Sequence, residues 1–124
     1  IETMLGAHTR LEGDLRFSGG LRIDGAVKGN VYGDPDKPSM LVITDTARIE
    51  GEVHVGHLIL NGTVVGPVHV AELLELQPKA RIEGNVQYAA LEMHQGAVVM
   101  GTLAHSVPGD VKLLPNLKLA SNQD

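Results

Sequence analysis

Histidine and glutamate are the side chains of this sequence that could bind a metal or move a proton. His54 and His69 each follow a glycine by three residues, and imidazole is a common metal ligand. The chain has no cysteine, and no carboxylate accompanies the pair at a spacing typical of a zinc site. The other four histidines are scattered and form no pair of nucleophile and base. We therefore interpret His54 and His69 as exposed members of a polar ladder, and we expect no metal and no cofactor.

Three glutamates, Glu12, Glu50 and Glu83, each stand directly before a glycine. Acid–base catalysis needs carboxylates held in a cleft, and we expect these three on an open outer wall. The glycines are expected at bends rather than between a strand and a helix, so no phosphate-binding loop is predicted. The sequence therefore predicts a protein that is not an enzyme.

Six glycines recur along the chain and mark a repeat, with separations of 16, 22, 15, 18 and 17 residues. Apolar residues occupy the positions two before, two after and eight before each glycine, and they alternate as in a strand. A repeat of this length indicates a solenoid, in which stacked repeats bury a shared apolar face. The glycines are Gly13, Gly29, Gly51, Gly66, Gly84 and Gly101; two before them stand Leu11, Val27, Ile49, Val64, Ile82 and Val99; two after stand Leu15, Val31, Val53, Val68, Val86 and Leu103; eight before stand Leu5, Leu21, Ile43, Leu58, Leu76 and Met93.

The predicted fold is all-β: a single-stranded parallel β-helix of about six coils over residues 1–105, with about three short strands in each coil. Only 2 % of the residues are aromatic, which suits a narrow interior filled by stacked aliphatic side chains. The net charge of −5 and the lack of a basic block predict no nucleic-acid partner. No apolar run reaches the roughly 18 residues of a membrane span, and the absence of cysteine fits a reducing cytoplasm.

Two features interrupt the uniform repeat. The stretch from Gly33 to Ser39, with two prolines and two aspartates, predicts a surface loop extruded from the second coil. Coils one, three and five carry an outward arginine and glutamate around the central aliphatic residue, whereas coils two, four and six lack this pair. Alternation keeps identical charges about 10 Å apart rather than about 4.8 Å, so we interpret it as electrostatic spacing of a solvated wall.

Three phrases of the sequence, at residues 21–31, 47–53 and 74–86, resemble the bactofilins, a family of bacterial cytoskeletal proteins. The resemblance covers residues 3 to about 105. It implies a right-handed parallel β-helix, non-polar filaments joined end to end, and no bound nucleotide. It also implies a scaffold at the inner face of the cytoplasmic membrane that recruits cell-wall enzymes or membrane proteins. The family's short membrane-targeting N-terminal segment is not seen in this sequence, so membrane association would depend on a segment outside it.

The predicted site of action is the pair of uncapped ends of the helix, where open strand edges can pair with another copy of the chain. The C-terminal surface comprises Met93, Val98, Val99, Met100 and Leu103, and the N-terminal surface comprises Ile1, Met4 and Leu5. Residues 106–124 form a separate apolar tail, expected to pack on its own solenoid or a neighbouring subunit, or to bind a partner. Its apolar residues are Val111, Leu113, Leu114, Leu117 and Leu119.

Two alternative functions remain open from the residues alone. Leu5, Leu11, Phe17 and Ile23 repeat every six residues, as in the left-handed β-helix of hexapeptide acyltransferases. That period breaks near Val27, however, and the extruded loop carries no histidine for catalysis. The second alternative is an adaptor that does not polymerise, with its end capped by the tail and its loop and wall free to bind a partner.

Overall fold

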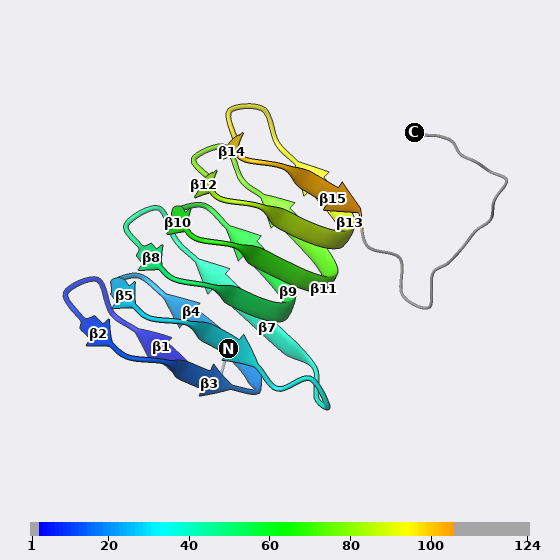
Figure 1. Ribbon diagram of the computed structural model, residues 1–124. Coiled ribbons are helices and arrows are strands. Elements are labelled where there is room, and N and C mark those ends of the chain that lie inside the picture. The colour runs from blue at the N-terminus through cyan, green and yellow to red at the C-terminus, as the bar shows by residue number, and fades with distance from the viewer. Residues whose placement is uncertain (1–2, 106–124) are drawn as a thin grey trace, which may run out of the picture.

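The computed structural model describes residues 3–105, and every regular element in that range is a β-strand. The strands form three sides of a solenoid (Figure 1). The first side holds β1 (Thr3–Leu5), β4 (Gly19–Ile23), β7 (Ser39–Ile43) and the second halves of β9 (Val53–Leu60), β11 (Val68–Leu76) and β13 (Val86–Met93). The second side holds β2 (Arg10–Glu12), β5 (Ala26–Lys28), β8 (Arg48–Glu50), β10 (Thr63–Val65), β12 (Arg81–Glu83) and β14 (Val98–Met100). The third side holds β3 (Leu15–Phe17), β6 (Val31–Gly33), the first halves of β9, β11 and β13, and β15 (Leu103–His105).

Each strand of the inner coils pairs in parallel with its counterparts in the coils directly above and below it, and each strand of the end coils pairs with one neighbour. The second side runs without interruption through β2, β5, β8, β10, β12 and β14. The predicted all-β parallel solenoid of about six coils is therefore confirmed. Two of the three predicted aliphatic ladders are confirmed as well, because the residues two before and two after the six glycines pair in register throughout.

The core is the column of aliphatic side chains inside the three sides. Val27, Ile49, Val64 and Ile82 are buried in the four inner coils, whereas Leu11 and Val99, at the two ends of the same ladder, are only half-buried. A fully buried valine or isoleucine contributes about 1.5–3 kcal/mol relative to exposure. The interior coils therefore supply most of the stability, and each end coil lacks one of the two neighbours that would complete its burial.

The third predicted ladder, eight residues before each glycine, is wrong at two positions. Leu5 pairs with Ile23 rather than Leu21, and Leu76 pairs with Leu60 rather than Leu58. The reason is the corner between the first and second sides. This corner has two residues in coils two and four, residues 24–25 and 61–62, but four residues in the other coils. Leu21 and Leu58 are still buried, one inward position further from the corner.

The short corners require glycine for steric reasons. A Cβ added to Gly62 would collide with the carbonyl oxygens of Thr44 and Ala47 in the coil below. Gly25 is crowded in the same way by the carbonyl oxygens of Gly6 and Thr9. A two-residue corner thus fits inside the four-residue corner of the preceding coil only if it has no side chain at this position.

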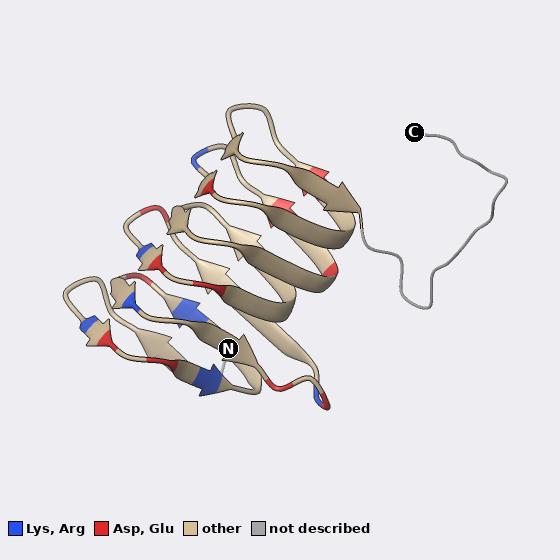
Figure 2. Cartoon of the chain, in the orientation of Figure 1, with Lys and Arg blue, Asp and Glu red and all other residues tan. Residues whose placement is uncertain are grey.

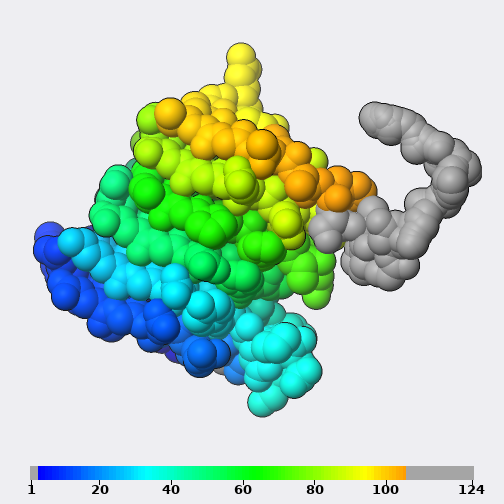
Figure 3. Space-filling model, in the orientation of Figure 1, coloured from blue at the N-terminus to red at the C-terminus, as the bar shows by residue number. Residues whose placement is uncertain are grey.

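The extruded loop predicted between the second and third coils is present as residues 34–38, which connect β6 to β7. Figure 3 shows it as a cyan protrusion from the side of the stack. Its base is held by Ser39, whose hydroxyl oxygen accepts a hydrogen bond of 2.9 Å from the backbone N–H of Gly56. The loop is therefore anchored to the coil above it.

Candidate assembly interfaces

The N-terminal end of the solenoid is formed by β1, β2 and β3, each of which pairs with only one neighbouring strand in the described chain. Met4 is 56 % exposed on this end, and Leu5 is half-buried against the core. The outer flank carries charge, since Arg10 Nε lies 3.5 Å from Glu12 Oε2. Ile1, the third residue predicted for this surface, lies outside the described residues. This end therefore combines a small apolar surface with a charged edge.

The C-terminal end is formed by β14, β15 and the last part of β13, which likewise pair only with the coil beneath them. Met93, Val98, Met100 and Leu103 are all exposed there, with Met100 at 52 %. Val99 is half-buried and packs against the core. Neither β14 nor β15 carries an Asp, Glu, Lys or Arg (Figure 2), and Glu92 is the one residue of these four types between residues 90 and 105. This end is therefore far more apolar than the opposite one.

Exposed large hydrophobic residues are concentrated in the first and last coils. Of the six in the described range, Met4 belongs to the first coil and four belong to the last. Met93 and Leu103 stand at inward positions of the open last coil, whereas Met4, Val98 and Met100 stand at outward positions. The structure thus brings together the described members of both predicted surfaces. The apolar tail residues, Val111, Leu113, Leu114, Leu117 and Leu119, lie outside the described residues.

Side-chain hydrogen bonds hold the corners of the end coils in register with their neighbours. Asp14 Oδ1 accepts the backbone N–H of Asn30 at 3.1 Å, and Asn85 Oδ1 accepts that of Thr102 at 3.3 Å. Asn30 Oδ1 does the same for Glu52 inside the stack, at 2.9 Å. In each case a side-chain oxygen of one coil accepts a backbone N–H of the next coil. These bonds fix the end coils against their neighbours.

The outer wall of the second side has the predicted alternation of charge. Arg48 lies between Ala26 and Thr63 in the ladder, and it bonds instead within its own coil, with Nε 3.0 Å from Glu50 Oε2. That hydrogen bond is the main reason that the pKa of Glu50 is lowered. Arg81 and Glu83 form the same pair at 3.2 Å. These outward side chains neutralise each other in pairs, so the wall is a solvated surface.

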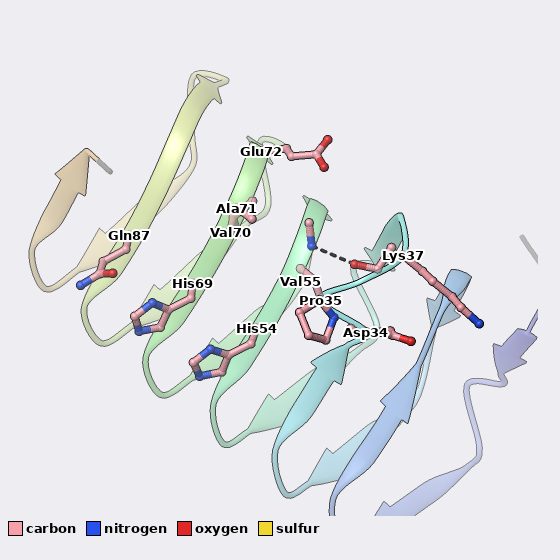
Figure 4. A pocket seen from close by; sticks show the side chains of 13 residues that line it. Asp34, Pro35, Lys37, His54, Val55, His69, Val70, Ala71, Glu72 and Gln87 are labelled. Atoms are coloured by element: carbon pink, nitrogen blue, oxygen red, sulfur yellow. Dashed lines mark hydrogen bonds between the residues drawn. The ribbon is translucent and has the colours of Figure 1, made fainter. Parts of the chain in front are cut away.

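The remaining candidate for chemistry is the hollow beside the extruded loop, of about 300 Å³ (Figure 4). His54 and His69 line it with their rings stacked, the centroids 4.5 Å apart and the planes at 6°. His54 Nε2 lies 2.9 Å from Glu52 Oε1. Across residues 3–105, no three His, Cys, Asp or Glu side chains converge as metal ligands would. The two histidines are neighbours in one ladder as predicted, but they are half-buried rather than exposed. The sequence did not reveal that the extruded loop stands next to them.

Asp24 occupies the short corner of the second coil and is nearly buried. Its Oδ1 accepts hydrogen bonds from Thr44 Oγ1 at 2.7 Å and from Arg22 Nε at 3.0 Å. The Thr44 bond, and after it the Arg22 bond, lower the pKa of Asp24 below its usual value. The charged carboxylate therefore links the second coil to the third through its hydrogen bond with Thr44.

Sequence reasoning missed one surface, the outward face of the first side. Met40, Val42, Ile59 and Leu73 point away from the core there, between the buried residues Leu41, Ile43, Leu58 and Leu74. The available signal was the pair of apolar runs at residues 40–43 and 58–60, in which both faces of a strand are apolar.

Comparisons with known proteins agree with this geometry. The model of one protein family, described as "Bactofilin: Polymer-forming cytoskeletal", matches residues 3–104. Searches among curated proteins and among solved structures gave no match. None of the described residues form a helix long and apolar enough to cross a membrane. The chain, whose residues 3–105 form a parallel β-solenoid, belongs to the bactofilin family of polymer-forming cytoskeletal proteins.

Proposed function

We propose that this chain assembles end to end through its two open coils, and that the resulting filament is a scaffold rather than an enzyme. The observation that carries the proposal is the position of the exposed hydrophobic residues, five of six of which lie in the first and last coils. Open strand edges join readily to other strand edges. Joining two ends would pair these edges and bury the apolar side chains, which extends one core through the whole filament.

The charge pattern of the ends supports joints between like ends, and hence a filament without polarity. A two-fold axis near Leu11 would set β2 of two N-terminal coils antiparallel. Arg10 of one copy would then face Glu12 of the other, and the reverse pair would form by symmetry. Two C-terminal coils would meet through Val98, Val99 and Met100, where no charge has to be desolvated.

Blocking one end at a time tests the proposal. Val99→Arg places a charge in the C-terminal surface, and Leu5→Arg does so in the N-terminal one. If like ends join, each variant should stop at a dimer in size-exclusion chromatography with light scattering, because its other end is intact. If unlike ends join, each variant alone should be a monomer and an equimolar mixture should form one dimer. Long filaments from both variants would show that the end coils are not the joints.

The cellular role that we propose is a scaffold at the inner face of the cytoplasmic membrane, which recruits cell-wall enzymes or membrane proteins. Membership of a cytoskeletal family supports a structural role over the hexapeptide acyltransferase alternative. Polymerisation, rather than adaptor function alone, is supported by the apolar end coils, which no other strand of residues 3–105 covers. A fluorescent fusion should form membrane-associated structures, and the Val99→Arg fusion should be diffuse. A wild-type fusion that is diffuse at native expression level would contradict this role.

A further inference from the structure

The outward face of the first side carries an apolar patch that belongs to neither end of the solenoid. We define the side patch as Met40, Val42, Ile59 and Leu73, which lie in coils three, four and five. Val42 pairs directly with Ile59, and His57 lies between Met40 and Leu73 in the neighbouring column. The strand pairs with extensive contacts in residues 3–105 are neighbours along the stack, and Met40 is 39 % exposed on this face.

Charged residues flank the side patch with opposite signs. The column that contains Val42 and Ile59 continues to Arg22 in coil two, and in the other direction to Glu75 and Glu92 in coils five and six. Arg22 is 46 % exposed in its side chain. Its Nε bonds to Asp24, and its terminal nitrogens have no hydrogen bond within residues 3–105. The Glu75 side chain is 24 % exposed; its Oε2 accepts a hydrogen bond from Gln77 Nε2 and lies 3.5 Å from His94 Nε2. Positive charge thus stands toward the N-terminal end of the patch and negative charge toward the C-terminal end.

We propose that the side patch binds the side patch of a second copy of the chain, with the two solenoids antiparallel. A two-fold axis along the strand direction, midway between coils three and four, sets Val42 against Ile59 of the second copy. The same axis sets Arg22 against Glu75 of the second copy, twice by symmetry. The apolar centre of one patch meets that of the other, Arg22 meets its opposite charge in Glu75, and Glu92 meets Met4 of the first coil. Sheets pack face to face in this way at about 10 Å.

The parallel arrangement does not have this complementarity. With both solenoids pointing the same way, coil five faces coil five and coil six faces coil six. Glu75 and Glu92 of the two copies would then gather on one side, where like charges repel. A membrane is a less favourable partner for the side patch than a second copy, because Glu75 and Glu92 would face anionic lipid headgroups. The charges therefore select a second, antiparallel copy.

Charge exchange between Arg22 and Glu75 tests the arrangement in full-length protein. The measurement is filament width in negative-stain electron microscopy. The inference therefore rests on the proposed end-to-end filaments. Wild-type filaments should be two solenoids wide. Arg22→Glu and Glu75→Arg should each give filaments one solenoid wide, or raise the concentration for pairing at least about tenfold. The double variant should restore paired filaments, as should an equimolar mixture of the two single variants.

Filament length separates this inference from the proposed function, because the changed residues lie in coils two to five and none belongs to an end coil. Short particles in the wild type would overturn the end-to-end assembly, whereas long filaments one solenoid wide in the wild type would overturn the lateral pairing alone. Stronger pairing in Glu75→Arg would show a parallel arrangement and refute the proposal.

Arg22→Glu places a carboxylate beside Asp24 and could destabilise the fold. A second variant therefore tests the pairing independently of it. Val42→Lys changes the centre of the patch at an outward, half-buried position, so its circular dichroism should match the wild type. We expect long filaments of single width from it. Paired filaments from folded Val42→Lys would overturn the proposal, since the lysine would lie in the middle of the interface.

Discussion

An arginine placed at three positions of the second side would separate folding from assembly. Val64 and Val99 occupy the same inward ladder, but Val64 lies between Ile49 and Ile82, whereas Val99 has only Ile82 beneath it. Val65 is next to Val64 and points outward, between Glu50 and Glu83. Val64→Arg, Val65→Arg and Val99→Arg therefore add the same charge to an enclosed interior, an outer wall and an open end.

The expected change in the free energy of unfolding depends on how deeply each valine is buried. Val64 is 0 % exposed, so its replacement loses about 1.5–3 kcal/mol of apolar burial. An unpaired buried guanidinium costs several kcal/mol more. The sum approaches the whole stability of an ordinary domain, about 5–15 kcal/mol, so Val64→Arg should unfold the protein. Val65→Arg should change the free energy of unfolding by less than about 0.5 kcal/mol, because its charge stays in water between two carboxylates.

Val99→Arg should fold and yet fail to assemble through its C-terminal end. The long side chain can bring its charge to water through the open end of the isolated subunit. In a joint between two C-terminal coils, both copies would bury the charge. A cost of about 4 kcal/mol per joint would raise the concentration needed for this contact about a thousandfold.

Circular dichroism and thermal unfolding of the three variants measure folding, and electron microscopy measures assembly. The expected order is an unfolded Val64→Arg, a folded Val65→Arg with normal filaments, and a folded Val99→Arg without filaments. Normal filaments from Val99→Arg would refute the assignment of the joint. A folded Val64→Arg would refute the description of the interior ladder.

Three further outcomes are expected. Gly62→Ala should lower stability by about 1–3 kcal/mol, measured as the denaturation midpoint, because its Cβ meets the carbonyl oxygens of Thr44 and Ala47; unchanged stability would contradict the packing of the short corner. The lowered pKa of Asp24 stabilises the fold above the unfolded-state value of about 3.9, and this stabilisation is lost as pH falls through the lower folded value. Asp24→Asn should therefore flatten the acid limb of the stability profile, and equal slopes in both proteins would contradict this. Calorimetry with acetyl-CoA should show no binding, and micromolar affinity would revive the acyltransferase alternative.

The sequence was sufficient to predict the six coils and two of the three inward ladders, because those ladders stand at fixed distances from a glycine that every coil needs. Gly29, for example, has φ of 150°, and a Cβ there would collide with the carbonyl of Gly13 below. The third ladder was misplaced because the corner between it and the glycine varies in length. A constant offset of eight residues cannot describe corners of both two and four residues.

The signal for the short corners was nevertheless present. Asp24-Gly25 and Asn61-Gly62 are turn dipeptides, and each directly follows an inward aliphatic residue, Ile23 or Leu60. Anchoring the ladder on the residue before these dipeptides would have given the observed register. The side patch was harder to find, because Met40, Val42 and Ile59 lie in runs that are apolar on both faces, where alternation carries no information.

What distinguishes an assembly residue from a core residue in this fold is the number of coils that touch it, rather than its type. Val64 and Val99 are the same amino acid in the same ladder, yet one is enclosed and the other lies at an open edge. The repeat pattern assigns both to the interior, and an inward residue in the last coil becomes interior only when a second subunit completes its surroundings. In the end-to-end assembly that we propose, the residues that join the chains are therefore core residues that one subunit leaves incompletely buried, and the same edge pairing and apolar burial serve folding and assembly.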